Sequence, residues 1–435
     1  MKKFIYGLAA FTLVSFGITS CSDDDNNGGG LGDEFQGGEG TMQEYTPEQS
    51  KEFLENTATE ALNMLNPEDQ RAVIELCSYF VDRYGDLDLP ENFAIEEDED
   101  NYVSGYMRSM ARAAASADPS SLTRAVYEYI YDINFNNFKG IYEPGNYEWE
   151  QVGESNDVVF RFTNAKGQNC ELKAVGSSNE YNTSVDWTED KWFGEESYQY
   201  NFTIPAEVSL TLTENGTQLV TAKVISNVNF AGHNFSINTE VKAANIIATA
   251  QTTGNDSKVT ETAETKVGGQ LYISETAVVN GSHLCDLDFY QKNFGDDGDA
   301  KAALSQLLRN GEAQVNVINK VYVDGIINYS NALYDALGLY ADTAQEAESY
   351  VTLLNQNIIG RVRYNNTTTV QAKVTWSYTT EKYGNYVEYY IEPQLEFPDG
   401  TTYYFSKYFE SGFDGVETLW NNLTKKYEAI WDAAN

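Results

Sequence analysis

Few side chains in this sequence, other than carboxylates, are suited to catalysis or to metal binding. Its 435 residues include two histidines, His233 and His283, and no HExxH motif. A histidine-rich metal site needs more than two imidazoles, and the sequence has neither a G-x-S-x-G elbow nor a glycine-rich phosphate loop. The sequence therefore predicts no catalytic residues, no metal site and no cofactor, and we interpret both histidines as structural.

Carboxylates are abundant, so they are the remaining source of chemistry. Paired acids can hydrolyse a glycosidic bond, but with 66 acidic residues no particular pair can be singled out. Residues 286–288 and 296–299 contain calcium-loop fragments, yet neither fragment completes the EF-hand spacing. We interpret them as acidic turns, and a carboxylate-based hydrolase such as a glycosidase remains an alternative.

One segment combines aromatic and acidic residues without a clear period. Residues 186–193, DWTEDKWF, lie between strand candidates, so we expect a loop. Exposed indole rings beside carboxylates can stack on sugar rings and bind their hydroxyl groups, which makes Trp187 and Trp192 candidate ligand-binding residues. The alternative is a loop that folds both rings back onto the edge of the sheet.

The cysteines after residue 21 are Cys77, Cys170 and Cys285. Their spacings are wide and include no CxxC motif, so a zinc site made of cysteines is excluded. One disulfide among the three is open, but we favour three small buried apolar side chains.

The charge of the chain restricts its partners. The formal net charge is −38, and residues 1–20 contain two lysines and no acidic residue, so the remainder has 26 basic and 66 acidic residues and a charge of −40. This balance excludes nucleic acid as a partner, because phosphates require basic patches. An apolar content of 41% is enough for a large buried core.

The first 21 residues have the organisation of an export signal. Met1, Lys2 and Lys3 are followed by an apolar run over residues 4–17 and then by ITSC, which ends at Cys21. This order resembles the lipobox of bacterial lipoproteins. The resemblance implies that residues 1–20 are a signal peptide, and that Cys21 carries acyl chains and anchors the protein to a membrane.

Ser22, Asp23, Asp24 and Asp25 follow the cysteine. They resemble the acidic export tag of surface-exposed outer-membrane lipoproteins of the Bacteroidetes. The resemblance implies an outer-membrane location facing the cell exterior, and it covers only the start of the chain. Residues 21–44 are otherwise rich in Gly, Asp and Asn, which is typical of a flexible tether.

The folded part is expected to begin with helices. Thr46-Pro47 predicts an N-cap and first turn, and apolar residues recur at helical spacing over 47–65 and 67–84, which we expect to form an αα-hairpin. We assign residues 45–120 to a helical segment that packs on the sheet. Residues 121–435 form the antiparallel-sheet α+β domain, whose last helix spans 413–433.

From about residue 125 the apolar period changes to two. The long alternating segments predict an α+β fold with a large curved antiparallel sheet that is covered on one face by amphipathic helices. At Glu214-Asn215-Gly216 we expect a three-residue loop rather than a two-residue turn, because the latter would place Val208 opposite Lys223. This predicts a positive φ at Gly216 and pairs Leu210 with Val220.

These features favour a cell-surface lipoprotein with a non-catalytic binding role, whose ligand is a glycan, a protein or an envelope component. A first alternative is a carrier of an apolar ligand in a half-open sheet cavity, which requires an incompletely filled apolar face. The second is the hydrolase named above. The sequence carries no signal for an oligomeric state.

Overall fold

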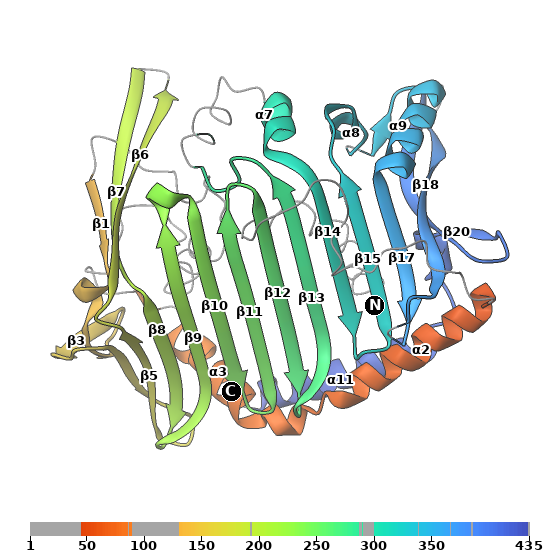
Figure 1. Ribbon diagram of the computed structural model, residues 1–435. Helices are drawn as coiled ribbons and strands as arrows, with labels where there is room; N and C mark the ends of the chain where they lie inside the picture. Colours follow the sequence, from red (N-terminus) through yellow and green to blue (C-terminus); the bar gives the residue numbers. More distant parts are fainter. Residues whose placement is uncertain are drawn as a thin grey trace.

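The computed structural model describes residues 45–85, 87–88, 130–191, 194–286, 289, 300–337, 339–365, 367–383 and 386–433. It has an α+β fold in which a large, mostly antiparallel sheet is covered on one face by helices, as the sequence predicts (Figure 1). The signal peptide, the tether, the acidic tag and Trp192 lie outside the described residues. Part of the 45–120 segment does too.

The main sheet runs in the order β3-β2-β4-β5-β8-β9-β10-β11-β12-β13-β14-β15-β17-β18-β19, and β16 and β20 both pair with the outer side of β19. Neighbours are antiparallel except for β2 and β4. No described pairing joins the two ends, so the sheet is open. Its strands are β2 Gly140–Pro144, β3 Trp149–Gly153, β4 Val158–Thr163, β5 Asn169–Gly176, β8 Glu207–Glu214, β9 Thr217–Asn229, β10 Asn234–Ala243, β11 Ile246–Asn255, β12 Lys258–Val267, β13 Gln270–Gly281, β14 Leu308–Val317, β15 Val321–Asn328, β16 Tyr340–Ala341, β17 Ile358–Tyr364, β18 Val370–Tyr383, β19 Tyr386–Glu396 and β20 Thr402–Tyr404.

A small second sheet of β1 (Ile130–Asn134), β7 (Gly194–Pro205) and β6 (Glu180–Lys191) projects beyond the edge of the main sheet (Figure 1). Strand β6 continues from β5, and β7 leads into β8, so the two sheets share one long two-stranded ribbon. Residues 186–191 belong to β6. The predicted loop at 186–193 is therefore wrong over its first six residues, because the chain keeps extended pairing with β7 there.

The turn between β8 and β9 is tighter than predicted. Glu214 pairs with Thr217, and Asn215 and Gly216 both have positive φ, +48° and +78°, so the loop has two residues. The expected positive φ at Gly216 is confirmed. Leu210 pairs with Ala222 and not with Val220, because a bulge at Leu219 shifts the register and keeps apolar residues opposite one another.

Three helices and a 3₁₀ turn cover one face of the main sheet: α2 (Pro47–Met64), η2 (Pro67–Gln70), α3 (Arg71–Tyr84) and α11 (Asp414–Asp432) (Figure 1). The capping box at Thr46 and Gln49 that begins α2 is present. Helices α2 and α3 lie end to end instead of forming the predicted αα-hairpin, and each packs against α11. In a hairpin α2 and α3 would pack their apolar faces against each other, whereas here each packs against the single long helix α11.

The other helices lie at the ends of strands. They are α7 (Ala300–Leu307), α8 (Asn331–Ala336), α9 (Ala344–Asn357) and α10 (Phe405–Tyr408), with short 3₁₀ turns η4 (Phe135–Phe138) and η5 (Phe230–Gly232). Helices α8 and α9 pack on β18 and β19 through a buried cluster that includes Leu333, Leu354 and Trp376.

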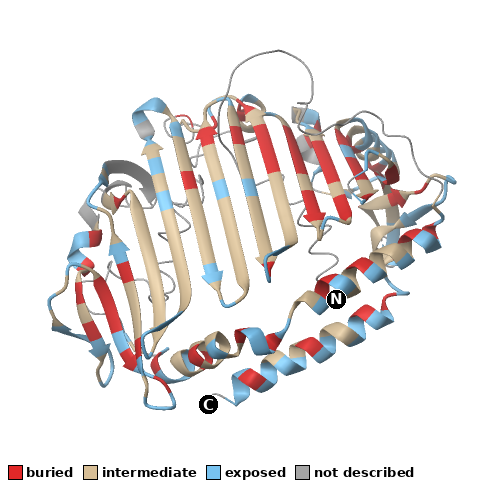
Figure 2. Ribbon diagram, turned by 60° about the horizontal axis from the view of Figure 1, so that its bottom comes forward, coloured by how far each residue is buried: buried red, intermediate tan, exposed pale blue. Residues whose placement is uncertain are grey.

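Register fixes the two faces of the main sheet. Val224, Thr239, Ala250 and Ala263 follow one another from β9 to β12 on the face that the helices cover, and Val323 lies further along the same face. Many of these residues are only half-buried, and Figure 2 shows intermediate burial over most of β8 to β11. The helix layer therefore leaves part of the apolar sheet face incompletely covered.

Candidate functional site

An apolar cavity of about 180 Å³ lies between the helix layer and the sheet. Leu54, Ala58 and Leu62 of α2 form one wall, and Val416 and Trp420 of α11 form another. Phe405, Phe409 and Phe413 close the side near α10. The sheet contributes the floor through β13, β14, β15, β17, β18 and β19, with Ile273, Val317, Val323, Gly325, Gly360, Val362, Val374 and Leu395.

The cavity is deepest at two glycine residues on neighbouring strands of the sheet. Gly325 of β15 pairs directly with Gly360 of β17, and both line the cavity. A Cβ atom on Gly360 would lie 2.6 Å from the Cβ atom of Val374, so the close packing of β17 and β18 requires glycine there. The opposing helix residue Ala58 is also small, and together these residues leave space that larger side chains would fill.

The polar groups of the cavity wall are mostly satisfied by protein. The hydroxyl groups of Ser50 and Tyr364 are hydrogen-bonded to each other, and the Thr57 hydroxyl donates to the carbonyl of Phe53 at 2.9 Å. Burial raises the pKa of Tyr364 well above its usual value, so this phenol stays protonated. Asp324 also lines the cavity, but register directs its side chain to the opposite face of the sheet, where it bonds to Arg363 and Gln314. Tyr272 is different: its hydroxyl has no hydrogen-bond partner among the described residues.

Polar contacts attach the helix layer around the cavity. Lys51 donates to the carbonyl of Ser411 at 2.7 Å, and the Tyr408 hydroxyl donates to the carbonyl of Pro47 at 2.8 Å. Along the opposite edge, strand turns reach the helices: Gln70 bonds to Asn245 at 3.0 Å. These contacts hold the helices over the cavity from both ends.

The uncovered face of the sheet is polar and slightly hollowed. A depression of about 530 Å³ lies over β9 to β13. Register aligns Lys223, Glu240, Thr249, Glu264 and Ser274 in one row across these strands. Asn238, Gln251, Thr262 and Thr276 form the neighbouring row. The described residues that line the depression offer amide, hydroxyl and carboxylate groups but no aromatic ring on which a sugar could stack.

Further along this face, an ion pair is buried. The Arg363 guanidinium binds Asp324, whose side chain is 3% exposed, and Gln314 also donates to this carboxylate at 2.7 Å. The hydrogen bond to Asp324 raises the pKa of Arg363 above its usual value. This arrangement satisfies the buried charges and is suited to a structural role.

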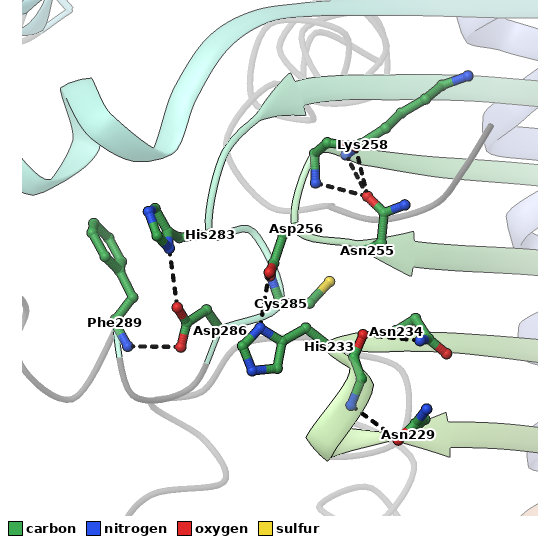
Figure 3. A network of polar contacts seen from close by, with 12 residues as sticks. Asn229, His233, Asn234, Asn255, Asp256, Lys258, His283, Cys285, Asp286 and Phe289 are labelled. Atoms are coloured by element: carbon green, nitrogen blue, oxygen red, sulfur yellow. Dashed lines mark hydrogen bonds and ion pairs between the residues drawn. The ribbon is translucent and has the colours of Figure 1, made fainter. Parts of the chain in front are cut away.

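The two histidines meet at one corner of the sheet, although 50 positions separate them (Figure 3). His233 lies 2.8 Å from a carboxylate oxygen of Asp256, and His283 lies 3.0 Å from one of Asp286 and stacks on Phe289. Burial alone would raise the pKa of Asp286, but hydrogen bonds from His283 and from the backbone N–H of Phe289 outweigh it and lower the pKa.

This corner has the features of a structural cross-link between loops. The other oxygen of Asp256 accepts a hydrogen bond from the backbone N–H of Cys285, so one carboxylate holds two chain segments together. Among the described residues, no group of three or more His, Cys, Asp or Glu side chains is placed to hold a metal ion. His233 lies in the turn directly before β10, and His283 follows β13.

Of the predicted site residues, only Trp187 lies among the described residues. Trp187 lies in β6, on the projecting ribbon, and Trp192 is outside the described residues, as are Cys21, Ser22 and Asp23 to Asp25. Cys77 and Cys170 are free thiols, so no disulfide joins any two of Cys77, Cys170 and Cys285. Cys285 is itself disulfide-bonded and Cys77 is only half-buried, so the expectation of three small buried apolar side chains is correct for Cys170 alone. Burial raises the pKa of Cys170 to about 11, which makes it unreactive.

Sequence reasoning did not find the cavity residues. The available signal was glycine at Gly325 and Gly360 within strongly apolar strands, which indicates a close approach or missing volume.

Among the described residues, no helix combines the length and apolar character needed to span a bilayer. No protein-family model matches the chain, and neither a curated protein nor a solved structure matches it.

Proposed function

We propose that this chain is a lipid-anchored binding protein of the outer-membrane surface that holds a small apolar molecule without transforming it. The observation that carries this proposal is the apolar cavity of about 180 Å³ beneath α2 and α11. From the sequence, a binder of glycans, proteins or envelope components is favoured over a carrier of an apolar ligand. The carrier requires an apolar sheet face that is incompletely filled. The cavity meets that requirement.

The size and lining of the cavity favour hydrocarbon. An engineered apolar cavity of about 150 Å³ in another protein stays dry and binds benzene, so the cavity here has room for one ring or a short alkyl chain. Side chains that line such a space lack packing partners on one side, and an apolar ligand that fills it supplies them.

The hydrolase alternative receives less support. A glycosidase acid needs a raised pKa so that it is protonated near neutral pH. The carboxyl groups of Glu68, Glu75, Asp286 and Asp399 have pKa values that are shifted downward, which is the opposite of what a general acid needs.

The polar depression over β9 to β13 favours a second candidate function, the binding of a glycan on the uncovered sheet face. Its rows of hydroxyl and amide groups can bond to sugar hydroxyls. The lack of a described aromatic ring in this depression makes it the weaker site, because stacking on such a ring provides much of the energy of sugar binding.

The test is thermal unfolding of the mature chain carrying Cys21→Ser, which removes the acyl chains that would compete for an apolar site. Toluene should raise the unfolding temperature in a saturable way, because a ligand at 100 times its dissociation constant stabilises a protein by about 2.7 kcal/mol. Soluble glucans serve as the second probe. Stabilisation by glucans alone would contradict the proposal and favour the polar face.

A further inference from the structure

We infer that Tyr272 is the polar contact of the cavity, and that its ligand is a neutral alkyl molecule with one hydrogen-bonding head group, such as an alcohol or an ester. This inference rests on the proposed function and specifies the class of ligand. It is carried by the position of Tyr272 in a bulge, by its unpaired hydroxyl and by the charges of the wall.

A β-bulge turns Tyr272 toward the cavity. Thr265 of β12 pairs with Ile273, but the next residue, Lys266, pairs with Leu271, so Tyr272 is the extra residue of β13. Strict alternation would place Tyr272 on the polar face, opposite in direction to Ile273. Both residues instead line the cavity. Bulges commonly re-aim a side chain near a functional site.

The hydroxyl of Tyr272 is available for a hydrogen bond to a ligand. Ser50, Thr57 and Tyr364 use theirs within the protein, whereas Tyr272 has no partner among the described residues. Burial, with a smaller contribution from the nearby Tyr427, raises the pKa of Tyr272, so the group remains a neutral donor and acceptor. A half-buried phenol beside hydrocarbon walls is suited to one polar atom on an otherwise apolar ligand.

The charges around the cavity disfavour an anionic head group. Among the described residues that line it there is no lysine, arginine or histidine. A fatty-acid carboxylate would therefore find no cation among these lining residues, in a chain that is strongly acidic overall. A neutral head group avoids this cost.

The experiment compares three probes on the Cys21→Ser chain at pH 8: 1-octanol, sodium octanoate and toluene. Each dissociation constant is measured with wild-type residues, with Tyr272→Phe, and with Tyr147→Phe as the matched control, because Tyr147 is 84% exposed. Tyr272→Phe should weaken 1-octanol about threefold to tenfold, the value of one hydrogen bond, and leave toluene unchanged. Octanoate should bind at least tenfold more weakly than 1-octanol.

The outcomes separate this inference from the proposed function. Toluene binding with 1-octanol unaffected by Tyr272→Phe would overturn the role of Tyr272 while the apolar site stands. Octanoate binding as tightly as 1-octanol would overturn the neutral head group. Failure of all three probes to bind would overturn both the inference and the proposed function.

Discussion

Gly325 and Gly360 lie directly opposite each other on neighbouring strands, on the face of the sheet that the helices cover. Neither residue contributes a side chain, so the cavity extends to the backbone of the sheet at a place that apolar side chains would otherwise fill. Helices α2 and α11 lie across this region and are fixed by polar contacts at their ends. The cavity therefore depends on the presence of glycine at positions 325 and 360.

Filling the cavity should abolish ligand binding. Val323 lines the floor of the cavity, and Val323→Phe adds a ring that occupies part of the space. We expect toluene to bind at least tenfold more weakly, measured by its shift of the unfolding temperature. Val152→Phe is the matched control, because Val152 is 53% exposed on β3. Equal toluene shifts in both variants would place the site elsewhere.

Removing Arg363 should be strongly destabilising. Arg363→Met leaves the carboxylate of Asp324, 3% exposed, buried without its cation, and such losses cost about 3 to 5 kcal/mol. The comparison is Lys173→Met, which breaks the more exposed pair with Asp157 and should cost less than about 1 kcal/mol. Urea unfolding measures both changes, and similar values for the two would contradict the buried pair.

Gly216→Ala should destabilise the β8–β9 turn by about 1 kcal/mol. Gly216 has a φ of +78°, which a residue with a Cβ atom adopts only with strain, and no atom lies within 4 Å of a Cβ placed there. The cost is therefore backbone strain without a clash. Gly153→Ala, which has no positive φ and places a Cβ 3.5 Å from Ile141, should cost less. The free energies of unfolding in urea decide between them.

The Asp286–His283 contact should contribute to stability above acidic pH. Because the pKa of Asp286 is lowered in the folded chain, its contribution is present above the ordinary aspartate pKa of 3.8 and is lost as the pH falls through the lowered value. Asp286→Asn should remove that part of the acid sensitivity. Urea unfolding between pH 6 and pH 2.5 tests this, and identical pH profiles for variant and wild type would contradict it.

The anchor and the acidic tag should be separable. Cys21→Ser should release the protein from the membrane fraction, whereas replacing Asp23, Asp24 and Asp25 with alanine should retain the protein in the membrane but reduce its exposure. A membrane-impermeant label on intact cells measures exposure. Unchanged labelling of the alanine variant would count against the tag.

Local pattern was enough to predict the elements and their faces. The capping box at Thr46, the stripe of α11 and the alternation around Val224 each depend on residues close together in sequence. The turn at Asn215-Gly216 could not be predicted correctly from alternation. A two-residue turn normally shifts the faces, and only the bulge at Leu219, which packs against the core, restores them.

The candidate site was harder to predict for the same kind of reason. The cavity depends on missing volume summed over α2, α11 and several strands, and no local pattern reports that sum. Tyr272 reaches the cavity because of a bulge, which reverses the side that alternation assigns to it. Trp187 and Trp192 were predicted to bind a ligand only because aromatic and acidic residues cluster at 186–193. Trp187 lies on the projecting ribbon of β6 and β7.

The most direct test of the apolar site is diffraction from crystals of the Cys21→Ser chain equilibrated with 8-bromo-1-octanol. We expect an anomalous bromine signal between α2 and the strands β15 and β17, near Val323 and Gly360, with the hydroxyl group within hydrogen-bonding distance of Tyr272. A bromine signal confined to the polar face of the sheet, or no ordered bromine in a crystal whose cavity is empty, would contradict it.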